Sequence, residues 1–202
     1  MATSEMTSDG AAPPGVPTTG DAGGGDETAE LREERRRAER YALDLLARRP
    51  RTVRELTRRL ESRGYAARVV ADISRGCIEA GYLDDRRFAQ SWIEESMRSR
   101  PSGRLRVRAE LRRKGVAGEV VAEALSRLLP DDREAELARD LAWRKVGGPR
   151  PPDEAAQGKL WGFLRRRGFT AEACRQAVRA VFGPVEGVDE AGPDYPYDPD
   201  DL

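Results

Sequence analysis

Three glycines, spaced 51 and 53 residues apart, mark an internal repeat that constrains the fold of this 202-residue chain more than any other feature. Gly64, Gly115 and Gly168 each follow apolar residues four and eight positions upstream, and each precedes another apolar residue. This pattern is typical of a helix that ends at a glycine in the left-handed conformation. Three copies in register predict three tandem units of about 50 residues. The matched apolar residues are Leu56, Leu60 and Tyr65, then Val107, Leu111 and Val116, then Leu160, Leu164 and Phe169.

Capping residues and helix breakers divide residues 31–183 into nine predicted helices, three in each unit. Thr52-x-x-Glu55 and Asp131-x-x-Glu134 are read as capping boxes, in which the first side chain accepts a hydrogen bond from the first turn. No segment alternates apolar and polar residues in the manner of a strand, so the chain is predicted to be all-α. The predicted caps are Asp26, Thr52, Asp84, Asp131, Asp153 and Thr170, and two of the predicted helices cover 67–79 and 104–114.

The size of the repeat unit sets the expected architecture. A unit of roughly 50 residues is too small for a large core of its own, so neighbours are expected to stack and share buried faces. We therefore predict three tandem three-helix repeats, at 31–83, 84–130 and 131–183, in an elongated, curved arrangement. Ile78, Leu129 and Phe182 occupy matching positions and extend the apolar pattern of the units.

Two acidic segments flank the repeats. Residues 1–30 contain six acidic residues and no basic ones, and residues 184–202 contain seven acidic residues and no basic ones. Both segments are poor in large apolar side chains, and the second has repeated prolines. Such composition buries too little surface to offset the entropy of ordering the chain, so both tails are predicted to be disordered.

The formal net charge of zero hides a strong separation of charge. All 36 basic residues lie within 31–183, which holds 23 acidic residues and so carries a net charge of +13. This excess favours an anionic partner, such as nucleic acid or a nucleoprotein. A genome rich in arginine codons explains why 33 of the 36 are arginine, but not why acidic residues gather in the tails.

Basic residues concentrate near the repeat glycines. A cation directly before each glycine is explained by the helix dipole, an effect of about 0.3–1 kcal/mol. The neighbouring cations need another explanation. In the helix over 104–114, Val107 and Leu111 mark the buried face, and the basic residues are expected to fan out over the solvent side with only Glu110 to offset them. The candidate contact residues for a partner or for nucleic acid are Arg63, Arg104, Arg106, Arg108, Arg112, Arg113, Lys114, Arg165, Arg166 and Arg167.

Few features of the sequence indicate an enzyme. The chain has no histidine and no glycine-rich phosphate loop, which removes the common nucleophile pairs and nucleotide sites. Asp84-Asp85 and Asp131-Asp132 each open a predicted helix, so capping is favoured over metal binding. Cys77 and Cys174 fall on apolar helix faces and are expected to be structural. We expect no enzyme activity, no cofactor and no metal site.

The sequence also bears on location. Its N-terminus lacks the basic and apolar regions of a signal peptide, and no apolar run approaches the ~18 residues of a membrane span. Two cysteines without disulfide or metal spacing suit a reducing compartment. We expect a monomeric cytoplasmic protein without membrane contact.

Four segments together resemble the RecX family of recombinase regulators. They are ALDLLARRPRTVRELTRRLESRGY, GYLDDRRFA, RVRAELRRKGV and KLWGFLRRRGF, in that order, and the similarity covers about residues 41–183. The resemblance implies binding to the RecA recombinase and to its filament on single-stranded DNA. It also implies inhibition of recombinase, ATPase and coprotease activities, and so a role in DNA repair, homologous recombination and the SOS response. Weak binding to single-stranded DNA, and to duplex DNA, is a further implication.

Two other functions remain open from the residues alone. Three-helix modules with basic helices also suit a stand-alone DNA-binding protein made of helix-turn-helix-like units. A solenoid scaffold for proteins would share the architecture, but it predicts no affinity for polyanions. The charge of +13 on residues 31–183 favours the first of these two over the second.

Overall fold

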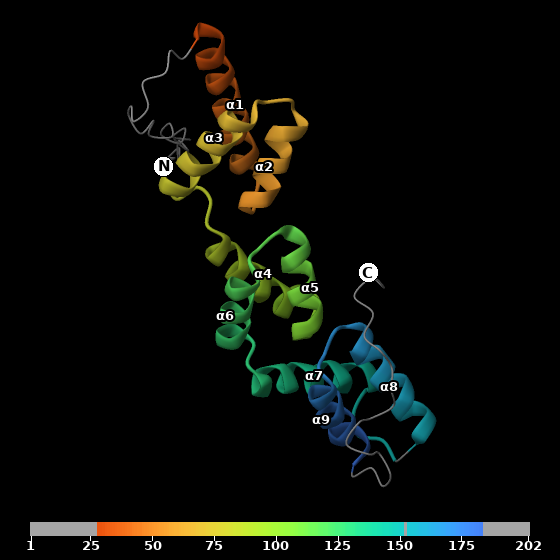
Figure 1. Cartoon of the computed structure of the whole chain (residues 1–202). Coiled ribbons are helices and arrows are strands. Elements are labelled where there is room, and N and C mark those ends of the chain that lie inside the picture. The colour runs from red at the N-terminus through yellow and green to blue at the C-terminus, as the bar shows by residue number, and fades with distance from the viewer. Residues whose placement is uncertain (1–27, 152, 184–202) are drawn as a thin grey trace, which may run out of the picture.

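The computed structural model describes residues 28–151 and 153–183, and within these ranges every regular element is an α-helix. Figure 1 shows the helices in three groups that follow one another along an extended, bent path. The prediction of three tandem three-helix repeats is confirmed. Repeat 1 comprises α1 (Ala29–Arg48), α2 (Val53–Ser62) and α3 (Ala67–Glu79); repeat 2 comprises α4 (Asp85–Ser99), α5 (Arg104–Lys114) and α6 (Gly118–Leu128); repeat 3 comprises α7 (Asp131–Val146), α8 (Glu154–Arg166) and α9 (Ala171–Phe182).

The predicted acidic tails fall almost wholly outside the described residues. Of the segment 1–30, only residues 28–30 are described, and Ala29 and Glu30 belong to α1. The cap expected at Asp26 also lies outside the described residues. The N-cap of α1 is Thr28, whose hydroxyl accepts a hydrogen bond from the amide of Leu31.

Four of the predicted caps are confirmed, and one is wrong. The side chains of the four confirmed caps each accept a hydrogen bond from an amide three residues further along the chain. α7 departs from this pattern, because its N-cap is Pro130 and no side chain caps it. Asp131 is instead the first residue of the helix, and Glu134 turns its carboxylate to another part of the molecule. The confirmed caps are Thr52, Asp84, Asp153 and Thr170.

Each repeat encloses its own core, which contradicts the expectation of shared buried faces. The helices of a repeat pack chiefly on one another, and the buried apolar residues form three separate clusters. Among the described residues, only Leu137 of α7 packs against two of these clusters. Three helices are therefore enough to close a small core, and the repeats are joined mainly by polar contacts.

The apolar repeat pattern fails at one position. Leu129 and Phe182 are buried, as the pattern indicates, but Ile78 is 47% exposed. Its neighbour Cys77 is fully buried and occupies the position in the core of repeat 1 that the pattern assigned to Ile78. The repeats therefore match in their second helices more closely than at the ends of their third helices.

The matched pair Leu111 and Arg112 tests the helical face assigned to α5. Leu111 is fully buried in the core of repeat 2, whereas Arg112 is exposed. We expect Leu111→Ala to lower the free energy of unfolding by about 2–5 kcal/mol, because it leaves a cavity. Arg112→Ala should cost less than about 0.5 kcal/mol. Denaturant unfolding monitored by circular dichroism measures the free energy of unfolding of both variants. Equal losses would contradict the assignment of Leu111 to the buried face of α5.

Candidate partner-binding surface

The second helices of the three repeats meet end to end. The amides of Gly103 and Leu105, at the start of α5, donate to the carbonyls of Arg167 and Gly168, at the end of α8, over 2.9 and 3.0 Å. Free amides at the start of one helix thus satisfy free carbonyls at the end of the next. The start of α2 also meets the end of α5, but here a side chain makes the contact in place of backbone amides. There the hydroxyl of the buried Thr52 donates to the carbonyl of Lys114 over 2.7 Å.

A carboxylate from the following repeat completes each junction. At the junction of repeats 1 and 2, Asp85 of α4 accepts a hydrogen bond from the amide of Val53 over 3.0 Å. At the junction of repeats 2 and 3, Glu134 of α7 accepts from the amide of Arg104 over 2.8 Å. Val53 and Arg104 are the first helical residues of α2 and α5. The first helix of each following repeat therefore caps the second helix of the repeat before it.

Glu134 is the most deeply buried charged residue of the described chain. It is fully buried and also accepts from the hydroxyl of Thr170 over 2.7 Å and from the amide of Thr170 over 3.3 Å. One carboxylate thus joins α5, α7 and the start of α9. This explains why Glu134 does not act in a capping box at the start of its own helix.

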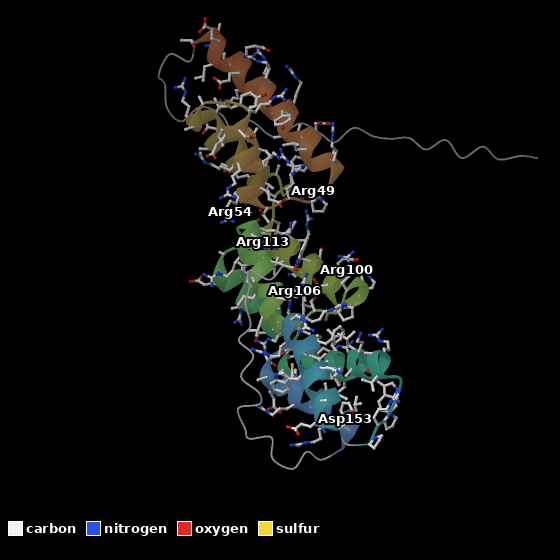
Figure 2. The ribbon with its side chains drawn as sticks, turned by 90° about the vertical axis from the view of Figure 1, so that its right-hand side faces the viewer. Arg49, Arg54, Arg100, Arg106, Arg113 and Asp153 are labelled. Carbon is white, nitrogen blue, oxygen red and sulfur yellow. The ribbon has the colours of Figure 1, made fainter. Side chains whose placement is uncertain are left out.

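Two of the repeat glycines allow the junctions to close. Gly115 and Gly168 have φ angles of +93° and +76°, which an L side chain rarely adopts. A Cβ atom on Gly115 would also overlap Arg54, and one on Gly168 would overlap Arg106. Figure 2 shows Arg54 beside Arg113 where repeats 1 and 2 meet, with Arg106 lying nearer repeat 3. The glycines that end the second helices therefore also permit close approach of the preceding repeat.

The side chains of five of the ten candidate cations donate hydrogen bonds to other groups of the chain. The expectation that the basic residues of α5 all face solvent is wrong for Arg104, Arg106 and Lys114, whose side chains are only 19, 30 and 23% exposed. The junctions bring Asp131 and Glu55 to the two ends of α5, whereas Arg106 pairs with Glu110 of its own helix. The contacts are Arg104 with Asp131, Arg106 with Glu110, Lys114 with Glu55, Arg165 with the carbonyl of Phe169, and Arg167 with the carbonyl of Pro101.

The other five candidates are exposed on the second helices. Arg108, Arg112 and Arg113 lie on α5, and within the described residues their guanidinium groups pair with no carboxylate. Arg166 is exposed near the end of α8, and Arg63 lies 5.0 Å from the ring centre of Tyr41. Because α2, α5 and α8 follow one another end to end, these cations are distributed along the length of the molecule.

Sequence reasoning missed a basic cleft beside the junction of repeats 1 and 2. Its volume is about 500 Å³, and it opens between the end of α1, the α3–α4 loop and α4. Burial lowers the pKa of Arg51, and the nearby positive charge of Arg49 lowers it further. No local spacing marks this cleft, since its two sides are at least thirty residues apart in the sequence. The side chains that give it its character are Arg48, Arg49, Arg51, Arg87, Tyr82 and Phe88.

Glu55 holds two cations at this same junction. Its carboxylate accepts from Arg49 over 3.0 Å and from Lys114 over 3.2 Å, and the Lys114 ammonium lies 4.3 Å from the ring centre of Trp92. Burial would raise the pKa of Glu55, but the hydrogen bonds from Arg49 and Lys114 outweigh it and lower the pKa. The ionised carboxylate is therefore the form that stabilises the junction.

The lowered pKa of Glu55 predicts a pH dependence. A carboxyl group whose pKa is lower in the folded state than in the unfolded state stabilises the fold at pH values above the unfolded-state pKa of about 4.3. This stabilisation is lost as the pH falls from there through the folded-state pKa. Asp85 acts in the opposite direction, because burial raises its pKa. We therefore expect the free energy of unfolding to fall more between pH 5 and pH 3 in the wild type than in Glu55→Gln. Parallel curves for the two proteins would contradict this.

The two cysteines lie in the cores of repeats 1 and 3. Cys77 and Cys174 are buried, and burial raises the pKa of their thiols to about 11 and about 12, so neither is poised as a nucleophile. In the described ranges, no cluster of three metal-ligating side chains occurs. No helix among these residues is long and apolar enough to cross a membrane.

Family models match all three repeats. The models that describe the first, second and third three-helix domains of RecX match residues 38–73, 84–125 and 131–178. Together they follow the chain through repeats 1, 2 and 3 in order.

Curated relatives support the same family. A regulatory protein RecX from Mycobacterium sp. (strain JLS) is 35% identical over 166 residues, which is 80% of this chain and 90% of that protein. The regulatory protein RecX of Chlorobaculum tepidum is 36% identical over 144 residues, with 71% of this chain and 87% of that protein covered. The one from Halorhodospira halophila is 37% identical over 155 residues, covering 75% and 90%.

Solved structures show the same fold. The crystal structure of RecX from Lactobacillus salivarius has a TM-score of 0.63 at 21% identity, and the match covers 75% of this chain and 98% of that one. A second crystal structure of a regulatory protein RecX has a TM-score of 0.62 at 23% identity, with 72% of each chain covered.

Proposed function

The chain belongs to the RecX family, and we propose on this basis that it binds the RecA recombinase and its filament on single-stranded DNA. In this proposal it is a non-enzymatic cytoplasmic regulator. It inhibits the recombinase, ATPase and coprotease activities of RecA, and thereby modulates homologous recombination, DNA repair and the SOS response. The family resemblance supports RecA as the partner, and the surface of this chain supports an anionic target.

The observation that carries the proposal is the row of exposed cations on α2, α5 and α8. Residues 31–183 carry a net charge of +13, and Arg108, Arg112 and Arg113 have no carboxylate partner within the described residues. A filament of recombinase on DNA offers phosphates and acidic side chains at regular intervals. An extended basic surface matches such a target better than it matches a small ligand.

The end-to-end junctions give this surface its shape. Backbone hydrogen bonds, the buried Glu134 and the close approach at Gly115 and Gly168 hold the three repeats in one bent array. A fixed array binds neighbouring protomers of a filament at once, so each contact raises the effective concentration for the next. A protein that binds one state of the filament more tightly than another shifts the filament toward that state.

The direct test is the ATPase activity of RecA on single-stranded DNA, with and without this protein. We expect substoichiometric inhibition relative to RecA protomers, because one extended molecule contacts several of them. Titration at two salt concentrations shows whether the effect weakens as charges are screened. No change in ATPase activity, with full binding of DNA retained, would contradict the proposal.

That last outcome would favour the alternative of a stand-alone DNA-binding protein. Three basic three-helix repeats along one axis are compatible with tracking a duplex. In that case affinity for duplex DNA would fall steeply with salt. Recombinase activity would change only as far as the protein competes for the DNA.

A further inference from the structure

The array of repeats has one unfilled junction. At the starts of α2 and α5, the first helical amide donates to a carboxylate of the following repeat, which is Asp85 or Glu134. The start of α8 occupies the same place in repeat 3, and the chain beyond Gly183 lies outside the described residues. Asp153 caps the amide of Ala156, and among the described residues no acceptor bonds to the first helical amide, that of Glu154.

A basic cavity of about 420 Å³ lies at this free end of repeat 3, where Figure 2 labels Asp153. Two of the three lysines of the chain line it, together with Arg150, and within the described ranges none of these three cations pairs with a carboxylate. Its apolar lining includes Val146, Leu160 and Phe182, and one carboxylate, that of Asp153, also lines it against the three cations. The lysines are Lys145 and Lys159. The cavity therefore suits an acidic segment that also carries apolar side chains.

The chain itself supplies such a segment. Phe182 lines the cavity, and the described chain ends one residue later, at Gly183. Residues 184–202 contain seven carboxylates and no cation, and they include Tyr195 and Tyr197. The last carboxylate, that of Asp201, is eighteen residues beyond Gly183, and eighteen extended residues span up to about 59 Å, so every carboxylate of the segment can reach the cavity.

The order of the repeats points to the same occupant. In repeats 1 and 2, the chain that leaves the third helix forms the next repeat, and that repeat places a carboxylate at the start of the second helix. In repeat 3, the chain that leaves α9 is the acidic segment. We propose that residues 185–202 bind in the cavity formed by α7, α8 and the loop between them, with their carboxylates beside Lys145, Arg150 and Lys159.

Such a contact goes beyond the proposed function, because it requires neither recombinase nor DNA. It gives the open end of the array a polar cap, as terminal units do in other repeat proteins. It also covers three cations that would otherwise attract phosphate, and it thereby confines the exposed basic surface to the α2–α5–α8 row. An external polyanion must compete with a tethered segment for this end of the molecule.

Zero-length cross-linking of the full chain with a carbodiimide tests the contact. This reagent joins an amine to a carboxylate that touches it, and the chain has only three lysines. Lys114 and Glu55, whose Nζ and Oε1 atoms lie 3.2 Å apart, provide an internal positive control. We expect peptides that join Lys145 or Lys159 to residues 186–201, in yields that fall when salt rises from about 0.1 to 1 M.

Two controls keep the result decisive. A mixture of ¹⁴N- and ¹⁵N-labelled protein distinguishes cross-links within one chain, which support the proposal, from those between two copies, which overturn it. The quadruple variant Asp194→Asn/Asp198→Asn/Asp200→Asn/Asp201→Asn keeps the length of the segment, and it should lower the yield of cross-links at the unchanged Glu186, Asp189 and Glu190, because less charge then holds the segment beside the lysines. Formation of the Lys114–Glu55 product without any product from Lys145 or Lys159 would also overturn the proposal. None of these outcomes depends on RecA, so the proposed function is tested independently of this contact.

Discussion

The triple variant Arg108→Glu/Arg112→Glu/Arg113→Glu is expected to fold normally and to lose most inhibition of RecA. All three side chains are exposed on α5, and within the described residues none has a carboxylate partner to lose. A hydrogen bond to a charged group contributes about 1.5–3 kcal/mol. Even after allowance for non-additivity, three reversals should weaken binding by at least a hundredfold. RecA ATPase activity on single-stranded DNA is the measurement, and circular dichroism reports the fold.

The exposure of these residues decides the choice of positions. Arg106 lies on the same helix, but its side chain pairs with Glu110 and its backbone packs against Gly168. Reversal of Arg106 would therefore disturb the junction of repeats 2 and 3, and lost inhibition would not identify a contact. Arg108, Arg112 and Arg113 avoid this difficulty.

A matched control separates a specific contact from general electrostatics. Arg36, Arg98 and Arg133 are exposed, lie on the first helices α1, α4 and α7, and each pairs with a glutamate three residues away. Their joint replacement by glutamate changes the net charge by the same amount. If this control loses inhibition as strongly as the α5 variant, the cation row is not the contact surface. The same conclusion follows if the α5 variant inhibits as well as wild type.

Local sequence signals were sufficient for the helices. Thr52, Asp84, Asp153 and Thr170 cap their helices as predicted. Two helices, 67–79 and 104–114, have the predicted bounds. These features depend on residues only a few positions apart, and capping groups and helix-ending glycines act over that range. The threefold repetition then made the number of helices in each unit predictable.

The joints between repeats depend on distant residues and could not be predicted in the same way. Glu134 stands three residues after Asp131, so its spacing matches a capping box, yet its carboxylate serves Arg104 and Thr170, which lie 30 and 36 residues away. A buried carboxylate with three donors outweighs a cap that solvent can replace. The local sequence pattern contains no information about which of these two sets of hydrogen bonds Glu134 makes.

The same limit applies to the candidate surface. The sequence located the basic helix α5, but it could not separate exposed Arg112 from Lys114, two residues further along and engaged with Glu55. The difference follows from the position of repeat 1 against the end of α5. It also explains why the cleft beside Arg51 went unpredicted.

Glu134→Ala is expected to have the largest effect on stability among single substitutions at the junctions. The change leaves the amides of Arg104 and Thr170 and the hydroxyl of Thr170 without their acceptor. A buried donor without a partner costs about 1–3 kcal/mol, so we expect a loss of roughly 3–5 kcal/mol in the free energy of unfolding. Glu134→Gln keeps one carbonyl oxygen as an acceptor and should lose less.

Glu136 provides the control two residues away on the same helix. It is exposed and pairs only with Arg133 across one helical turn, so Glu136→Ala should cost less than about 0.5 kcal/mol. Urea unfolding monitored by tryptophan fluorescence compares the variants, because Trp92 and Trp161 report on repeats 2 and 3. Small-angle X-ray scattering adds a second readout. A junction that depends on Glu134 should open in Glu134→Ala and raise the radius of gyration under native conditions, whereas equal midpoints and radii in both alanine variants would show that the other junction contacts suffice to hold repeats 2 and 3 together.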